Sequence, residues 1–161
     1  MNSNMTPIDW AKRPLQKYAD FSGRAPRAEY WWFMLSMVIV FVVLTIVESI
    51  VGLNKMVLGL YGPLTTLLWL AVLVPSLSVG VRRLHDTNRS GWWLLLIVPY
   101  AIGGVLMARS MSAAAATGTV PGFGAAGILM GIGFVCVIVL LVFYCLAGTP
   151  GDNRYGPNPY G

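Results

Sequence analysis

Charged residues are scarce in this sequence. Of 161 residues, 11 are Lys or Arg and 6 are Asp or Glu, which together make up 11% of the chain. A soluble domain carries about 25% charged residues, so this composition excludes an ordinary soluble protein. Hydrophobic residues make up 57% of the chain, and the net charge is +5. In so apolar a chain a basic excess is typical of membrane topology and of anionic lipid contact, and we expect no nucleic-acid partner.

Histidine and cysteine are also scarce. The chain has one histidine and two cysteines, Cys136 and Cys145, which would lie on different faces of one helix. We therefore expect reduced, packed thiols, and a single histidine with scattered acids predicts no metal site and no cofactor. The first thirty residues lack the apolar core of a secretory signal peptide, so we expect the first hydrophobic span to remain in the protein.

Long apolar runs fill most of the chain. A helix needs about 20 apolar residues to cross a hydrocarbon core about 30 Å thick. The runs predict an all-α integral membrane protein, a single membrane domain with four transmembrane helices. These helices are expected at 30–51, 64–81, 92–108 and 124–146.

The remaining segments are polar or rich in small residues. Residues 1–29 predict a cytoplasmic lead-in with a short interfacial amphipathic helix that starts at Thr6-Pro7, although Pro14 makes two short turns an equal alternative. Gly52 to Lys55 predicts a short outer turn. The other connections are expected to be a cytoplasmic turn at 82–91, an outer loop at 109–123 with room for one helical turn, and a cytoplasmic tail of turns at 147–161.

The basic residues are distributed unevenly between the two sides of this arrangement. The side with both termini has nine basic residues, and the opposite side has only Lys55 and Arg109. By the positive-inside rule both termini are therefore expected to be cytoplasmic. The pairs Trp31-Trp32 and Trp92-Trp93 then become anchors at the inner interface, where indole rings prefer to lie. The nine basic residues of the predicted cytoplasmic side are Lys12, Arg13, Lys17, Arg24, Arg27, Arg82, Arg83, Arg89 and Arg154.

Two groups of polar residues and one pair of glycines, inside or beside the spans, suggest specific roles. Glu48 lies near the outer end of the first span and is interpreted as an interfacial acid near Lys55, or alternatively as a buried carboxylate that moves ions or protons. Asp86 is expected to pair with an arginine that precedes the first span, and His85 to be a hydrogen-bonded structural residue. Gly127 and Gly131 form a small-residue pair that predicts a helix contact, within the chain or with a second copy.

Three polar motifs together resemble one known family. They are RRLHDTNRSGWW at 82–93, YADFSGRAPRAEYW at 18–31 and GDNRYGPNP at 151–159. In this order they resemble the YhaH/YhaI-like bacterial inner-membrane proteins, which share domain of unknown function 805. The resemblance implies a multi-pass protein of the bacterial inner (plasma) membrane and brings no catalytic residue or ligand. The Ala-rich segment at 110–123 matches no part of that pattern.

All three motifs fall on the predicted cytoplasmic side, so any site is expected to form there. We predict a non-enzymatic interaction, scaffold or lipid-binding protein that contacts anionic headgroups and that can self-associate. A small oligomeric transporter or channel is the alternative, and a headgroup-modifying enzyme that uses His85 and Asp86 is a third hypothesis. The candidate cluster comprises Arg24, Arg27, Arg82, Arg83, His85, Asp86, Arg89 and Asn153.

Overall fold

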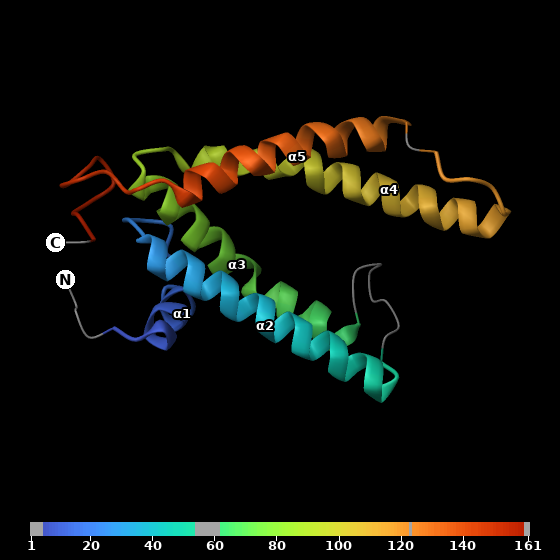
Figure 1. The fold of residues 1–161 in the computed structure, drawn as a ribbon, viewed down its shortest axis with the longest axis horizontal. Coiled ribbons are helices and arrows are strands. Elements are labelled where there is room, and N and C mark those ends of the chain that lie inside the picture. Colours follow the sequence, from blue (N-terminus) through green and yellow to red (C-terminus); the bar gives the residue numbers. More distant parts are fainter. Residues whose placement is uncertain (1–4, 54–61, 123, 160–161) are drawn as a thin grey trace. The chain divides into compact units, whose positions relative to one another are not determined.

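The described part of the chain is built from helices. The computed structural model describes residues 5–53, 62–122 and 124–159. The helices, drawn in Figure 1, are α1 (Pro7–Gln16), α2 (Arg27–Val51), α3 (Pro63–Asp86), the short 3-10 helix η1 (Gly91–Ile97), α4 (Val98–Thr117) and α5 (Gly124–Cys145). Four stretches are long and apolar enough to cross a membrane, namely α2, α3, η1 together with α4, and α5. The all-α architecture with four membrane-spanning helices is therefore confirmed.

The chain forms two compact units. The first comprises Met1–Gly91 and Ala147–Gly161, and the second comprises Trp92–Leu146. In the first unit α2 and α3 lie side by side, and α1 packs against both near the start of α2 (Figure 1). In the second unit α4 and α5 pack together along their lengths.

Helix α1 starts where the sequence predicts. Thr6 is its N-cap and forms a capping box with Asp9, whose amide donates to Thr6 Oγ1 at 3.3 Å. The hydrogen bonds from Thr6 hold the pKa of Asp9 below its ordinary value. The helix continues through Pro14 as one element, and Pro14 is buried. The alternative of two separate turns is therefore wrong.

Glu48 lies close to the C-terminal end of α2, and its side chain is buried. Its side chain reaches the first turn of α3, where it accepts hydrogen bonds from the amides of Leu64 at 2.5 Å and Thr65 at 3.0 Å. The Thr65 hydroxyl donates to its second oxygen at 2.6 Å. The carboxylate thus satisfies amides that have no partner within α3 and offsets the positive end of the helix dipole. Its expected neighbour Lys55 lies outside the described residues, as does the second half of the expected outer turn.

Two helices extend further than the apolar runs indicate. Helix α3 continues to Asp86, so the first half of the segment expected as a cytoplasmic turn, 82–91, is helical. Helix α4 continues to Thr117, so most of the expected outer loop at 109–123 is helical as well. Alanine-rich sequence favours helix although its hydropathy is modest, which explains the second difference.

Close packing in the second unit runs through glycines other than the expected pair. A Cβ on Gly103 would lie 2.8 Å from the Met130 amide nitrogen, and one on Gly133 would lie 2.5 Å from Tyr100 Cα. A Cβ on Gly131 would meet nothing within 4 Å. Gly127 is half-buried. Of the pair Gly127 and Gly131, Gly131 therefore does not take part in the contact between α4 and α5.

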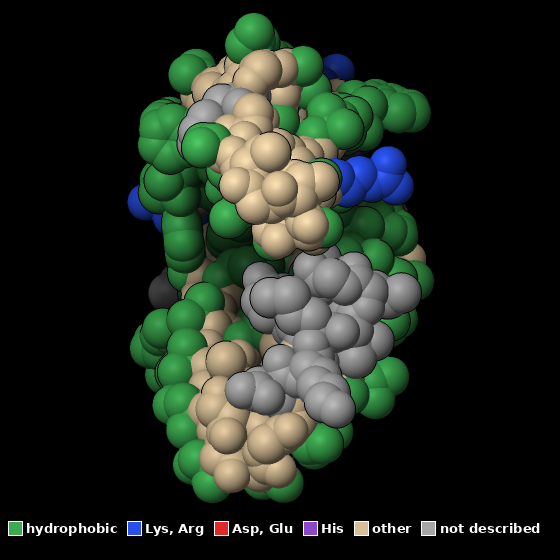
Figure 2. All heavy atoms as spheres, turned by 90° about the vertical axis from the view of Figure 1, so that its right-hand side faces the viewer, with side chains coloured by type: hydrophobic (Ala, Val, Ile, Leu, Met, Phe, Trp, Pro, Cys, Tyr) green, Lys and Arg blue, Asp and Glu red, His purple; other side chains and the backbone are tan. Residues whose placement is uncertain are grey.

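Most of the surface of the spans is apolar. On α2, for example, Val38, Ile39 and Val42 are all exposed. Figure 2 shows a face on which hydrophobic side chains dominate. Such a surface is stable against lipid chains, and the buried interior then depends on packing and polar contacts more than on hydrophobic burial.

Candidate functional site

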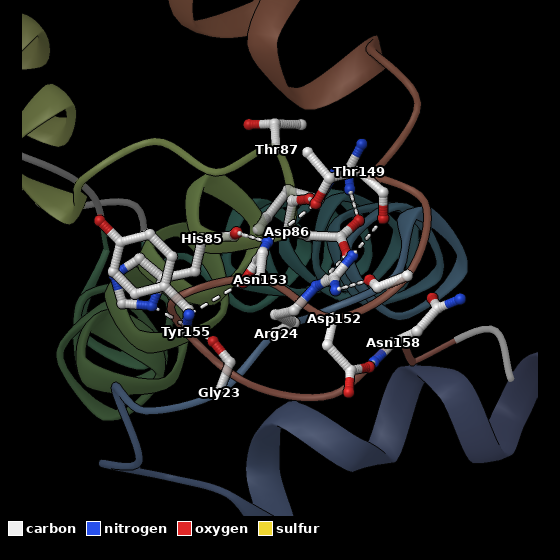
Figure 3. A network of polar contacts seen from close by, with 12 residues as sticks. Gly23, Arg24, His85, Asp86, Thr87, Thr149, Asp152, Asn153, Tyr155 and Asn158 are labelled. Atoms are coloured by element: carbon white, nitrogen blue, oxygen red, sulfur yellow. Dashed lines mark hydrogen bonds and ion pairs between the residues drawn. The ribbon is translucent and has the colours of Figure 1, made fainter.

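The three polar motifs converge at one end of the first unit. Arg24 lies before α2, Asp86 ends α3, and Thr149 to Tyr155 belong to the C-terminal tail (Figure 3). Arg24 and Asp86 are both buried in this arrangement. Figure 3 shows side chains from all three segments directed toward one another. We call this group the polar clasp, and it comprises Gly23, Arg24, Arg83, His85, Asp86, Gly148, Thr149, Gly151, Asn153 and Tyr155.

Arg24 is the centre of the polar clasp. Its Nε donates to Asp86 Oδ1 at 3.0 Å, and its Nη2 lies 3.0 Å from the same oxygen. Nη1 donates to the carbonyl of Gly151 at 2.6 Å, and Nη2 donates to that of Thr149 at 2.7 Å. The second Asp86 oxygen accepts from Arg83 Nη1. One planar guanidinium therefore connects the end of α3 to the tail, and the expected arginine pair of Asp86 is present.

The tail caps the C-terminus of α3. The last carbonyls of a helix have no partner within it and must find one elsewhere. The carbonyl of Asp86 accepts from the Thr149 amide at 2.9 Å and from its hydroxyl at 3.1 Å. The carbonyl of His85 accepts from Asn153 Nδ2 at 3.0 Å, and that of Arg82 accepts from the Ala25 amide at 3.0 Å. The tail and the segment before α2 thus serve as the cap.

Glycine at 148 is required by the close approach of the tail. A Cβ at this position would lie 2.7 Å from Asp86 Cγ, well inside van der Waals contact. Any larger residue there would push the tail away from α3 or displace the carboxylate. The Gly-Thr pair at 148–149 therefore has a defined role, with no side chain at the first position and a capping hydroxyl at the second.

His85 faces a different direction from Asp86. Its ring stacks on Tyr155 with centroids 3.8 Å apart and an interplanar angle of 3°, and its Nδ1 lies 3.2 Å from the Gly23 carbonyl oxygen. The histidine therefore joins the same three segments by packing, which agrees with the structural role expected for it. Arg154 beside it is exposed and donates to the Asn88 carbonyl at 3.1 Å.

A second buried ion pair lies beside the polar clasp. Arg82 and Glu29, both fully buried, are joined by a hydrogen bond of 2.5 Å from Nη1 to Oε1. Arg13 of α1 approaches the other Glu29 oxygen with its Nε at 3.4 Å, and its side chain is 34% exposed. Arg82 is thus paired with Glu29. Among the described residues it has no identified contact with the Asp86 carboxylate.

The other residues of the predicted cluster are not in the polar clasp. Arg27 is exposed at the first residue of α2, and Arg89 is half-buried with Nη1 donating to the Thr87 carbonyl at 3.2 Å. Among the predicted anchors, the exposed ring of Trp31 packs edge-on against Tyr30 with centroids 5.2 Å apart, and Trp32 beside it is exposed as well.

The second tryptophan pair lies in the second unit. Trp92 is highly exposed, and Trp93 packs edge-on against Phe143 with centroids 5.2 Å apart. Exposed indoles near helix ends suit membrane interfaces.

The exposed acids near α1 are stabilised as anions. Asp20 accepts from the Ser22 amide at 3.0 Å and from its hydroxyl at 2.5 Å. These hydrogen bonds hold the pKa of Asp20 below its ordinary value. It therefore stays charged at neutral pH and lies 3.9 Å from Lys17, a weak, exposed ion pair.

The geometry gives the buried charges structural roles. Asp86 forms ion pairs with Arg24 and Arg83, and Glu29 forms ion pairs with Arg82 and Arg13. His85 and Asp86 have separate partners and do not form an acid/base pair in any contact identified here. Among the described residues no group of three His, Cys, Asp or Glu side chains is placed to hold a metal ion.

Sequence reasoning missed several members of these two groups. Glu29 gave no signal beyond its place in a helical first turn, and Arg13 appeared as one of many basic residues. Thr149 and Gly148 stand in a Gly-Thr-Pro-Gly run that predicts turns, and the capping hydroxyl was the available clue. Buried pairing of Arg82 and Arg83 also has no sequence signature, because charged residues at a span end ordinarily reach outward.

Comparison with known proteins identifies similar chains over almost this entire length. The family model described as "Protein of unknown function (DUF805)" matches residues 18–157. The chain is 35% identical over 152 residues to inner membrane protein YhaH of Escherichia coli, covering 94% of this chain and 97% of that protein. It is 36% identical over 154 residues to inner membrane protein YhaI, with 94% and 96% covered. The uncharacterized protein YiiR is 27% identical over 143 residues, with 84% and 83% covered. No solved structure matches the chain.

Proposed function

Because this chain belongs to the DUF805 family of membrane proteins, whose inner-membrane relatives YhaH and YhaI it matches over most of their length, we propose that it is a non-enzymatic interaction protein of the inner membrane that binds anionic lipid headgroups at its cytoplasmic face. It is a multi-pass inner-membrane protein of the bacterial type. Headgroup binding, the cytoplasmic orientation and the absence of catalysis are the new parts of this proposal.

The observation that carries the proposal is the division of the basic residues of the first unit into two classes. Arg24, Arg82 and Arg83 are buried and paired with carboxylates, so they hold the fold together. A second class is exposed or half-exposed around them, and we call it the basic rim. Among the described residues it consists of Lys12, Arg13, Lys17, Arg27, Arg89 and Arg154.

The basic rim has the chemistry of a headgroup-binding surface. A basic residue close to an anionic leaflet contributes about 1 kcal/mol to membrane attraction. Exposed aromatic residues accompany the rim, including Tyr18 and Phe21 after α1 and Trp31 on α2. Amphipathic aromatic rings prefer the headgroup region, so the same surface offers both cations and interface anchors.

The buried charges support a binding role over a catalytic one. A general acid or base must be free to exchange a proton with a substrate. Asp86 and Glu29 are instead enclosed by arginines, and the His85 ring is engaged by Gly23 and Tyr155. Glu48, the acid that motivates a transporter, serves as a helix cap.

Native mass spectrometry of the purified protein tests the proposal. The protein is equilibrated with mixed phosphatidylglycerol and phosphatidylcholine micelles, and the retained lipids are counted. We expect selective retention of phosphatidylglycerol, reduced about fivefold for each rim charge removed in Arg27→Ala and Arg154→Ala. Arg27→Lys and Arg154→Lys, which keep the charge, serve as controls. Equal retention of both lipids by the wild type would contradict headgroup binding.

A further inference from the structure

The two buried carboxylates of the first unit are not equally satisfied. Asp86 receives hydrogen bonds from Arg24 on one oxygen and from Arg83 on the other. Glu29 receives one hydrogen bond, from Arg82 to Oε1. Its buried Oε2 has no hydrogen-bond partner and is held by the Arg13 ion pair at 3.4 Å. The weak point of the buried charge network is therefore the link between Glu29 and α1.

Arg82 has spare donors with which it can repair this weak point. Its Nε and Nη2 are buried and have no hydrogen-bond partner. These two N–H groups form the edge of a guanidinium that binds a carboxylate with two parallel hydrogen bonds. Nη2 is the neighbour of Nη1 on the same guanidinium, so the Nη1–Nη2 end of Arg82 can hold both Glu29 oxygens, with Nη1 on Oε1 and Nη2 on Oε2. Glu29 would then remain paired without Arg13.

Arg13 is the exposed member of this group. Its side chain is 34% exposed, whereas those of Arg82 and Glu29 are 0% exposed. Its guanidinium carbon lies 5.5 Å from the Trp10 ring centroid, within the range of a cation–π contact. Lys17, one turn further along, is 38% exposed. Like charges at this helical spacing repel each other, and an anion between them would remove that repulsion.

Helix α1 carries the apolar surface needed to bring Arg13 to a leaflet. Ile8 is 63% exposed and Leu15 is 43% exposed, on a helix that also presents Lys12 and Lys17. A helix of this composition lies in the interface with its apolar residues at the acyl boundary, and its cations then lie at the depth of the lipid phosphates.

We propose that Arg13 is a lipid-responsive residue that exchanges Glu29 for the phosphate of an anionic phospholipid, while Arg82 takes over Glu29 Oε2 with its spare donors. This inference rests on the proposed headgroup binding and names the residue and the ligand group. It also improves the charge balance. Glu29 with Arg13 and Arg82 carries a net charge of +1, whereas after the exchange Glu29–Arg82 and Arg13–phosphate are each neutral.

Lipid retention by matched variants tests the exchange. The full chain in nanodiscs of mixed phosphatidylglycerol and phosphatidylcholine is compared with Arg13→Ala and with Lys12→Ala. Lys12 is the neighbouring exposed cation on α1, and it contacts neither Glu29 nor Arg82 through any contact identified in the described part of the chain. We expect Lys12→Ala to lose about fivefold in phosphatidylglycerol preference, the share of one surface charge. Arg13→Ala should lose at least about tenfold more, because direct charge-assisted hydrogen bonds are lost as well.

Trp10 fluorescence provides a second readout, which follows the Arg13–Trp10 contact itself. The Trp10 contribution is the difference between the wild type and Trp10→Phe. On transfer from phosphatidylcholine to phosphatidylglycerol nanodiscs we expect this contribution to change as the guanidinium leaves the ring. The same change should be absent in Arg13→Ala.

The outcomes separate the two proposals. Equal losses in Arg13→Ala and Lys12→Ala, with phosphatidylglycerol preference intact in the wild type, would overturn the exchange and leave headgroup binding in place. An unchanged Trp10 contribution in the wild type would also overturn the exchange. A wild type without lipid preference would overturn headgroup binding and the exchange together.

Discussion

Arg24 and Asp86 show why single residues matter so much at the end of the α2–α3 pair. A buried ion pair gains little over a well-packed apolar pair, but removing one partner leaves the other charge buried and costs about 3–5 kcal/mol. Arg24 is more demanding still, because its guanidinium also serves two tail carbonyls. Its three nitrogens spread the donors widely enough to reach three acceptors, whereas a lysine has all its donors on one nitrogen.

Substitution of Arg24 by lysine therefore destabilises the first unit although the charge is kept. We expect Arg24→Lys to lose about 2–3 kcal/mol, because at least one tail carbonyl loses its donor. The midpoint of thermal unfolding in detergent measures the effect. Arg154→Lys is the control, since Arg154 is exposed and makes a single hydrogen bond to Asn88. Equal midpoints for the two variants would show that the tail carbonyls do not depend on Arg24.

Glu48 provides a second residue-scale prediction. Its removal in Glu48→Ala leaves the Leu64 and Thr65 amides without their acceptor, so we expect a loss of about 1–3 kcal/mol in stability. Ser49→Ala is the matched control, because Ser49 is exposed and bonds only the Thr45 carbonyl within its own helix, as far as the described contacts go. A stable Glu48→Ala protein with altered proton flux in liposomes would instead favour a transport role for Glu48.

At the scale of elements, the α4–α5 pair depends on backbone approach at small residues. Without a hydrophobic driving force in lipid, two helices associate through close packing, which glycine permits. Gly133 faces the backbone of Tyr100, whereas Gly131 on the same helix faces open space.

The two glycines therefore make a matched pair for substitution. We expect Gly133→Ala to lower the unfolding temperature of the protein by several degrees, since the added methyl forces α4 and α5 apart, at a cost of about 1–3 kcal/mol. Gly131→Ala should leave the unfolding temperature unchanged. If Gly131 lies between two copies of the chain, its substitution would instead shift the oligomeric state in crosslinking, in the direction of monomers.

The elements were predictable where one physical signal dominated. Four apolar runs identified the four spans, because the hydrocarbon core demands about 20 apolar residues in each. The ends of α3 and α4 were not predictable from hydropathy. Helix α3 runs on through Arg82 and Arg83 because these side chains find buried acids, which the sequence alone does not reveal. The start of α1 was predictable because capping is a local interaction between Thr6 and Asp9.

The site was predictable in part, because the spans fix which polar residues lie at the same end of the helices. Shared location near the end of spans brought Arg24, Asp86 and Asn153 into one cluster, and the structure joins all three. The burial of Arg82 and Arg83 was not predicted. Both were expected to face lipid headgroups, whereas in the structure they are buried counter-ions of Glu29 and Asp86. Glu29 was missed because a carboxylate in the first turn of a helix has an adequate local explanation in the helix dipole.

At the scale of the whole molecule, the polar clasp constrains topology. Arg24, Asp86 and Thr149 are in direct contact, so the chain returns to the same membrane face after α3 and again after the second unit. The distribution of basic residues, nine against two, assigns that face to the cytoplasm in our proposal.

Reporter fusions test this orientation. Green fluorescent protein fused after residue 161 should fluoresce, and alkaline phosphatase fused at the same point should be inactive, because the second enzyme matures only outside the cytoplasm. Phosphatase inserted after Gly118, where α4 ends, should be active. The reverse pattern at both positions would invert the proposed topology and move the basic rim to the outer leaflet.

The use of the tail as the cap of α3 has a consequence for biosynthesis. The ribosome makes the chain from its N-terminus, so a nascent protein that has reached Leu146 already contains Arg24 and Asp86 but neither Thr149 nor Asn153. In that interval the carbonyls of His85 and Asp86 have no tail partner to accept from. Residues translated after all four spans therefore complete the cap of the first hairpin. A chain cut short between α3 and Thr149 therefore lacks the tail residues that cap the end of α3.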